Sequence, residues 1–98
     1  MLQLVSFQAP IVGIFRAPTD KDKKELLVVE LKRAKASDAV VGQILRYMGY
    51  VQAELAEEGQ VVKGVIIGLK DDDRIRLALS ITPNIQFYRY QISFKLVK

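Results

Sequence analysis

Two apolar runs separated by a long amphipathic segment constrain the fold of this chain more than any other feature. Residues 26–29 (LLVV) and 61–69 (VVKGVIIGL) have the length and the β-branched content of buried strands. Between them, residues 38–59 carry apolar side chains at helical spacing. The predicted core-facing stripe consists of Val41, Ile44, Leu45, Met48, Val51 and Leu55. Two strands joined by such a helix form a βαβ unit, so we expect parallel strands and a right-handed crossover.

Residues that favour helix ends and close packing mark the limits of this long helix. Ser37 is the expected N-cap, and Asp38 places a negative charge in the first turn, where the helix dipole favours it. Gly59 is the expected stop. Gly42 and Gly49 lie inside the helix, where glycine is unfavourable, so they indicate close packing against the sheet.

The remaining segments complete a mixed sheet. Residues 2–15 read as two short strands that break at Pro10, and residues 16–25 as a solvated polar loop. Residues 71–80 form a short helix with Asp72 or Asp73 as its cap. The last expected strand, residues 85–97, places on one face Tyr88, Tyr90, Ile92, Phe94 and Leu96.

The two helices differ in how much sheet they can cover. We expect the long helix to cover one face and the short helix to cover little of the other. Apolar sheet surface that stays uncovered indicates a partner, and the simplest partner is a second copy of the chain. The expected assembly is therefore a homodimer.

Composition limits the chemistry that this chain can perform. Its 98 residues fit one domain, residues 1–98. The absence of Cys and His excludes disulfides, histidine general bases and ordinary zinc sites, and leaves hard cations held by oxygen atoms. The net charge of +4 is compatible with a polyanion such as DNA. No signal peptide or membrane span is evident, so we expect a soluble cytoplasmic protein.

A carboxylate and an ammonium group end the first buried strand on the same face. Glu30 and Lys32 are two residues apart, and Gln43 and Tyr47 share one side of the following helix. Hydrolysis of a phosphodiester uses carboxylates to hold magnesium and a cation beside the attacked phosphate. The alternatives are a structural ion pair between Glu30 and Lys32, a Tyr47 packed at the edge of the stripe, and a Gln43 bonded to the backbone.

A wider pattern surrounds these four residues. The strand ends in ELKR, and the helix carries Asp38, Gln43, Arg46 and Tyr47 in an order that resembles PD-(D/E)xK nucleases. Within that superfamily, residues 26–96, including YQISFKL near the end, resemble the nuclease domain of the archaeal and actinobacterial mismatch-specific endonuclease family. The resemblance implies a restriction-endonuclease-like α/β fold: a mixed sheet with a βαβ core, one long helix and one short helix. It also implies DNA hydrolysis with Mg²⁺ or Mn²⁺.

The resemblance assigns roles to individual residues. It implies that Glu30 and the backbone carbonyl of Leu31 bind the metal, and that Lys32 is catalytic. It implies that Gln43 and Tyr47 support the site and contact DNA. The candidates for phosphate contacts are Arg33, Lys35 and Arg46.

The N-terminal part departs from the family, which carries Gly-Arg-Ile-Asp on the preceding strand and an upstream helix that this chain lacks. Alignment places Gly13 on the Gly and Arg16 on the metal-binding Asp. Three interpretations stay open. A loop acid, or a carboxylate from a second subunit, completes an active nuclease. Alternatively, Arg16 pairs with Glu30 in a domain that binds DNA or a partner without cutting. Otherwise, the N-terminal segment is altered or truncated, and the missing region belongs to a larger enzyme.

Overall fold

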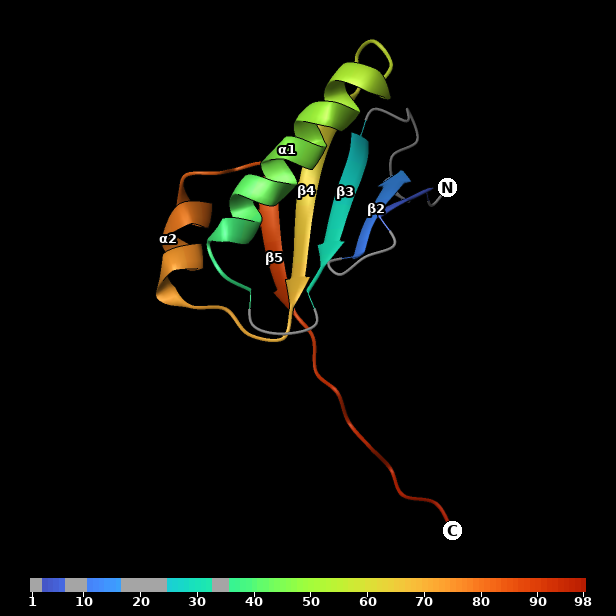
Figure 1. Ribbon diagram of the computed structural model, residues 1–98, viewed down its shortest axis with the longest axis vertical. Coiled ribbons are helices and arrows are strands. Elements are labelled where there is room, and N and C mark those ends of the chain that lie inside the picture. Colours follow the sequence, from blue (N-terminus) through green and yellow to red (C-terminus); the bar gives the residue numbers. More distant parts are fainter. Residues whose placement is uncertain (1–2, 7–10, 17–24, 33–35) are drawn as a thin grey trace.

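The computed structural model describes residues 3–6, 11–16, 25–32 and 36–98. Five strands and two helices follow one another along the chain. They are β1 (Gln3–Ser6), β2 (Ile11–Arg16), β3 (Glu25–Leu31), α1 (Ala39–Glu54), β4 (Val61–Gly68), α2 (Asp73–Ser80) and β5 (Ile85–Arg89). Figure 1 shows α1 lying across the sheet and α2 beside β5. This is the predicted mixed α/β fold with one long and one short helix.

The sheet is mixed, with the strands in the order β1-β2-β3-β4-β5. β1, β2 and β3 are antiparallel neighbours, whereas β3, β4 and β5 are parallel. The β3–α1–β4 unit confirms the predicted parallel βαβ core, and β4–α2–β5 adds a second parallel crossover. Two right-handed crossovers that advance in one direction place both helices on one face.

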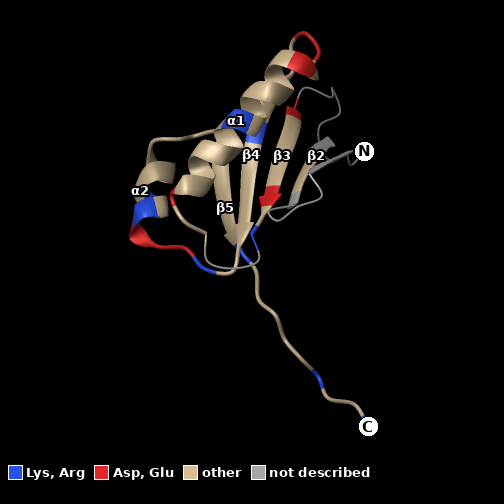
Figure 2. Ribbon diagram, viewed as in Figure 1, with Lys and Arg blue, Asp and Glu red and all other residues tan. Residues whose placement is uncertain are grey.

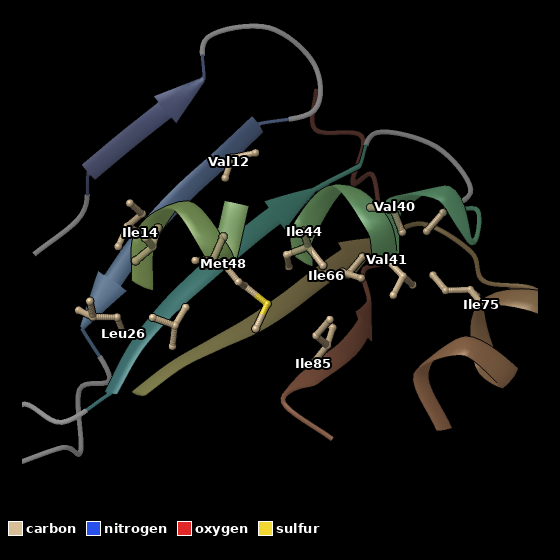
Figure 3. Close-up of a cluster of buried hydrophobic side chains, with 14 residues drawn as sticks. Val12, Ile14, Leu26, Val40, Val41, Ile44, Met48, Ile66, Ile75 and Ile85 are labelled. Carbon is tan, nitrogen blue, oxygen red and sulfur yellow. The ribbon is translucent and has the colours of Figure 1, made fainter. Parts of the chain in front are cut away.

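Both helices pack on the same face of the sheet, which we call the helix face. Ile75 of α2 is buried in the same core cluster as Ile44 of α1 and Ile66 of β4. Figure 3 shows these side chains between the helices and the sheet. The short helix was expected to cover little of the other face, and it lies instead on the same face as α1. The other face, which we call the open face, carries half-buried Leu27, Val29, Leu31, Val65 and Ile67.

The buried side of α1 differs from the predicted stripe at three positions. Its buried residues are Val40, Val41, Ile44, Met48 and Val51. Leu45 is 46 % exposed and Leu55 is 41 % exposed, so both predictions were wrong. Residues one position apart on a helix differ by roughly 100° around its axis. A stripe centred on Ile44 therefore turns Leu45 toward solvent and brings Val40 inward.

The closely packed glycines lie in β4 rather than in α1. No described atom lies within 4 Å of a Cβ built on Gly42 or Gly49, so the predicted close packing of these two residues was wrong. A Cβ on Gly64 would lie 2.7 Å from Met48 Sδ, and one on Gly68 would lie 3.1 Å from Ala36 Cβ. Glycine in β4 thus lets α1 and the segment before it approach the sheet.

The helix ends depart from the sequence prediction at α1 and agree with it at α2. Asp38, not Ser37, is the N-cap residue of α1, and within the described chain its side chain makes no capping hydrogen bond. α1 ends at Glu54, before Gly59, which adopts a positive φ of 84° in the turn that leads to β4. At α2, Asp72, one of the two expected caps, caps the helix and accepts a hydrogen bond from the Ile75 amide at 3.0 Å.

The C-terminal segment is the largest difference from the predicted elements. β5 ends at Arg89, and residues 90–98 have no regular secondary structure and extend away from the domain (Figure 1). Phe94 is 90 % exposed and Leu96 is 98 % exposed. The alternating pattern of this segment is that of a strand, but a strand needs a neighbour to accept its backbone hydrogen bonds.

Among the described helices, none combines the length and the hydropathy that crossing a membrane requires.

Candidate functional site

Glu30 is the second-last residue of β3 and is completely buried on the helix face. It is the one charged residue in the core of the described chain. The β2–β3 register places Val12 directly opposite Glu30, and the β3–β4 register places Ile66 opposite it on the other side. Val12 and Ile66 are themselves fully buried. The Glu30 carboxyl is therefore held between apolar neighbours.

Neither oxygen of the Glu30 carboxyl has a hydrogen-bond partner in the described structure. Burial raises the pKa of Glu30 above 4.5, and the nearby Lys32 ammonium offsets part of this rise. Buried polar groups in native proteins almost always have partners, because leaving one without a partner costs free energy. A buried carboxyl without a partner is therefore typical of a binding or reaction site rather than of a stabilising core.

Lys32 and Gln43 form the contact that joins β3 to α1. The Lys32 ammonium donates to Gln43 Oε1 at 3.1 Å, and the Lys32 amide donates to the Ile67 carbonyl at 2.8 Å. The side chain of Lys32 is thus anchored by the helix while its backbone continues the β3–β4 ladder. In the described structure the Gln43 side chain bonds to Lys32 rather than to the backbone.

The other residues predicted for the site have different surroundings. Tyr47 lies one turn after Gln43 and packs, half-buried, against the core cluster, which agrees with its structural interpretation. Arg46 is exposed on α1, and Leu31 is half-buried at the end of β3. Arg33 and Lys35 lie outside the described residues. The structure therefore brings Glu30, Lys32 and Gln43 together and leaves the roles of the others as predictions.

The β2–β3 register places Arg16 far from Glu30 along the sheet. Arg16 pairs with Leu26, four residues before Glu30, which corresponds to roughly 13 Å along the strand. The β2 residue that directly faces Glu30 is Val12, whose side chain cannot bind a metal. Sequence analysis did not identify Val12 as the neighbour of Glu30, because the pairing register is not visible in the local sequence of β2.

The oxygen atoms at this site could supply part of the coordination sphere of one hard cation. Among the described residues, no group of three acidic side chains could surround a metal ion. The Glu30 carboxyl nevertheless has two buried oxygens for which the described part of the chain supplies no hydrogen-bond partner. Mg²⁺ usually keeps several waters and binds through one or two carboxylates together with substrate phosphates. Glu30 therefore supplies the minimum protein contribution to such a site. The loop acids Asp20 and Asp22 lie outside the described residues.

Arg89 is a cation near this site that sequence analysis did not single out. Gly68 pairs with Arg89 on β5, and Lys32 directly follows Leu31, which pairs with Ile67. Lys32, Gly68 and Arg89 therefore lie in one row across the sheet and share the helix face. Figure 2 shows basic residues gathered where β3, β4 and β5 end. The local sequence of the last strand does not show that Arg89 lies near Lys32, because this placement depends on the registers of the β3–β4 and β4–β5 pairs.

Comparison with known proteins supports the fold. No family model matches the chain, and no curated protein matches it. Two solved structures share its architecture. EndoMS in its apo form aligns with 96 % of this chain at a TM-score of 0.70 and 19 % identity. A repair endonuclease from Pyrococcus abyssi aligns with 92 % of it at a TM-score of 0.61 and 23 % identity.

These comparisons confirm the predicted resemblance at the level of the fold. The domain has the restriction-endonuclease-like fold found in both structures. The chain spans 38 % of the length of each of them. At identities below one quarter, the similarity establishes the architecture, whereas function must be argued from the site.

Proposed function

We propose that residues 1–98 form a nuclease-like domain that binds DNA and hydrolyses a phosphodiester bond with Mg²⁺ or Mn²⁺. One observation carries this proposal: Glu30 is buried without a hydrogen-bond partner among the described residues, at the strand end where Lys32 is held by Gln43. A structural role would favour a partner for this carboxyl or an apolar residue in its place. A divalent cation would satisfy both of its oxygens.

The residues of the site have separate roles in this proposal. Glu30, with the backbone carbonyl of Leu31, would hold the cation. When bound, Mg²⁺ lowers the pKa of an attacking water and offsets negative charge on the phosphate. The Lys32 ammonium, oriented by Gln43, would contact a phosphate oxygen and stabilise charge that develops there. Tyr47 would support the helix side of the site.

Contacts outside the centre would position the DNA backbone. Arg46 is exposed on α1, and its guanidinium would contact a phosphate. Arg33 and Lys35 follow Lys32 closely in the sequence and are proposed for the same role. Such contacts supply affinity without sequence preference, because every nucleotide presents a phosphate.

The same proposal places the protein in the cytoplasm.

Completion of the site would require further oxygen ligands. Candidates are Asp20, Asp22 or a carboxylate from a second copy of the chain. A homodimer is part of the proposal, because no described helix covers the open face, and its exposed edge includes Tyr88. Covering that face in a dimer would bury apolar surface, which stabilises association.

A second candidate function is DNA binding without hydrolysis. It is favoured by Val12, an apolar residue that the sheet register places directly opposite Glu30 and that cannot help to hold a cation. In that case Lys32 and the neighbouring basic residues would still contact phosphates, while the cation would bind weakly or not at all. The two functions share a substrate class and differ in whether the DNA is cut.

A cleavage assay separates the two candidates. The wild type, Glu30→Gln and Lys32→Ala would be incubated with mismatched, flapped, branched and single-stranded DNA in Mg²⁺ or Mn²⁺. We expect metal-dependent cutting by the wild type and a loss of about 10²-fold or more in each variant, the scale associated with removing one transition-state contact. Glu25→Gln makes the same chemical change at the other end of β3 and should leave cutting intact. Absence of cutting by the wild type with either metal would reject hydrolysis.

A further inference from the structure

Both ends of the connection from β3 to α1 are held by the end of β4 and the turn that follows it. The Lys32 amide donates to the Ile67 carbonyl at 2.8 Å, and the Ala36 amide donates to the Lys70 carbonyl at 2.8 Å. Lys32 is the last described residue before this connection, and Ala36 is the first described residue after it. The position of one end relative to the other is therefore set by residues 67–70.

Gly68 lies between these two backbone contacts and faces Ala36. A Cβ built on Gly68 would lie 3.1 Å from Ala36 Cβ and 3.4 Å from the ring of Phe87. Ala36 is fully buried. Glycine inside a strand weakens the strand, and it often marks a place where another part of the backbone approaches closely. Gly68 therefore forms a seat in the sheet that Ala36 fills.

The contact at Gly68 is rigid, unlike the one at Gly64. A Cβ on Gly64 would meet Met48 Sδ at 2.7 Å, but the end of a methionine side chain can move to another rotamer. The Cβ of alanine has no rotamers and moves only with the backbone. Carbon atoms in contact are normally about 3.5–4.0 Å apart, so a Cβ at position 68 would displace the backbone at Ala36 or in β4 by roughly 0.4 Å or more.

The seat is connected to the candidate site through the start of α1. The chain enters α1 three residues after Ala36, and the Val40 amide donates to the Ser37 carbonyl at 3.1 Å. Gln43 lies in the second turn and accepts from the Lys32 ammonium at 3.1 Å. Such bonds are normally about 2.7–3.2 Å long, so this one is near its upper limit. A displacement of α1 by a few tenths of an ångström would therefore weaken it.

We propose that Gly68 is a positioning residue for the candidate site. By seating Ala36, it holds α1 at the distance from β3 at which Gln43 orients the Lys32 ammonium. The inference rests on the proposed function for the part that Lys32 plays in the reaction. The placement of the ammonium itself can be measured without DNA and without metal.

NMR spectroscopy measures how firmly the Lys32 ammonium is held. An ammonium group in a hydrogen bond exchanges its protons slowly with water and gives its own ¹H–¹⁵N signal, whereas the signals of freely exposed lysines are lost through rapid exchange. Lys32→Gln identifies the signal. In Gly68→Ala we expect the Lys32 protons to exchange about tenfold faster or more, which corresponds to the loss of one hydrogen bond to a charged group.

Exchanging the sizes of the two residues distinguishes positioning from a general loss of packing. Ala36→Gly breaks the same contact without adding an atom, and it should also speed up exchange at Lys32. The double variant Gly68→Ala with Ala36→Gly places the Cβ on the other side of the contact, so it should restore slow exchange. Each single variant should cut DNA more slowly by about 10-fold to 10²-fold, because a misplacement of about 1 Å can cost that much in rate. The double variant should recover cutting.

Two control variants test whether the effect is specific to the seat. Gly42→Ala makes the same change one residue before Gln43, where no described atom lies within 4 Å, and should leave the Lys32 signal unchanged. Val62→Ala truncates a buried side chain near the start of β4. It should lower Tm without changing exchange at Lys32.

Unchanged exchange at Lys32 in both single variants, or equally fast exchange in Val62→Ala, would overturn the role of Gly68. Absence of a slowly exchanging Lys32 signal in the wild type, or failure of the double variant to restore it, would also overturn it, as would normal cutting by a variant that has lost the signal. If Gly68→Ala does not fold, the comparison of Ala36→Gly with the wild type decides. If the wild type does not cut DNA, hydrolysis is rejected, and the NMR result still decides the positioning.

Discussion

Replacing Glu30 by Gln is expected to stabilise the protein, although Glu30 is the central residue of the candidate site. The wild-type carboxyl is fully buried without a described hydrogen-bond partner, and burial raises its pKa. A neutral amide of similar size removes the cost of burying a charge. The expected gain is about 1–3 kcal/mol in the free energy of unfolding at pH 8. For a domain of this size, each kcal/mol corresponds to roughly 4–8 °C in Tm.

The same substitution should change how stability depends on pH. The pKa of Glu30 is higher in the folded protein than in the unfolded chain, where it is near 4.5. Between these two pKa values the folded state binds more protons than the unfolded state. The contribution of Glu30 to stability therefore falls as pH rises through the folded pKa, and improves as pH falls toward 4.5. The gain from Glu30→Gln should be largest at high pH and shrink under acidic conditions.

Denaturant unfolding of both proteins across this pH range measures the difference directly. Glu25→Gln is the matched control, because Glu25 is partly exposed on the same strand and pairs with Lys63. Exposed pairs contribute about 0–1 kcal/mol, so the control should be neutral or slightly destabilised at pH 8. A Glu30→Gln variant less stable than the wild type at pH 8 would show that the carboxylate makes a stabilising interaction.

Truncating Ile44 should destabilise the protein more than truncating any other side chain of α1. Ile44 is fully buried at the centre of the core, and its Cδ1 lies 3.0 Å from the Cβ position of Gly64. Ile44→Ala removes three carbon atoms from this contact and leaves a cavity. The expected loss is about 2–5 kcal/mol, a large part of the roughly 5–15 kcal/mol that stabilises a small domain.

Leu45→Ala is the control for this experiment, because it also truncates a branched aliphatic residue and lies one position later on the same helix. Leu45 is 46 % exposed, so its truncation should cost less than about 1 kcal/mol. Thermal unfolding of both variants gives the comparison. Equal losses at the two positions would mean that α1 is rotated about its axis, with Leu45 turned toward the core.

Features that depend on local pattern could be predicted from the sequence. The βαβ core follows from two apolar runs and the helical periodicity between them. The support that Gln43 gives to the site was implied by the family resemblance rather than by local pattern, and its hydrogen bond with Lys32 agrees with it. Asp72 was identifiable as a cap because a short acidic side chain precedes a helical segment.

Features that depend on register or on a missing neighbour could not be predicted. The pairing of Val12 with Glu30 depends on the length of the connection between β2 and β3. The row that joins Lys32 to Arg89 depends on two parallel registers. Residues 90–98 alternate as a strand does, yet no described strand pairs with them. Leu45 is apolar, but the phase of the helix turns it away from the core, whereas Leu55 lies just beyond the end of α1 as its C-cap residue.

The carboxyl of Glu30, which has no hydrogen-bond partner in the part of the chain that the structure describes, is central to the proposed function as the site for a divalent cation. Thermal unfolding at increasing concentrations of Mg²⁺ and Mn²⁺ tests this role most directly, because a ligand that binds only the folded state raises Tm. At a metal concentration of 100 times Kd, the free energy of unfolding increases by about 2.7 kcal/mol. We expect Tm to rise with metal in the wild type and in Glu25→Gln, and to stay constant in Glu30→Gln. A wild-type Tm that does not respond to either metal, or an equal rise in Glu30→Gln, would contradict this role.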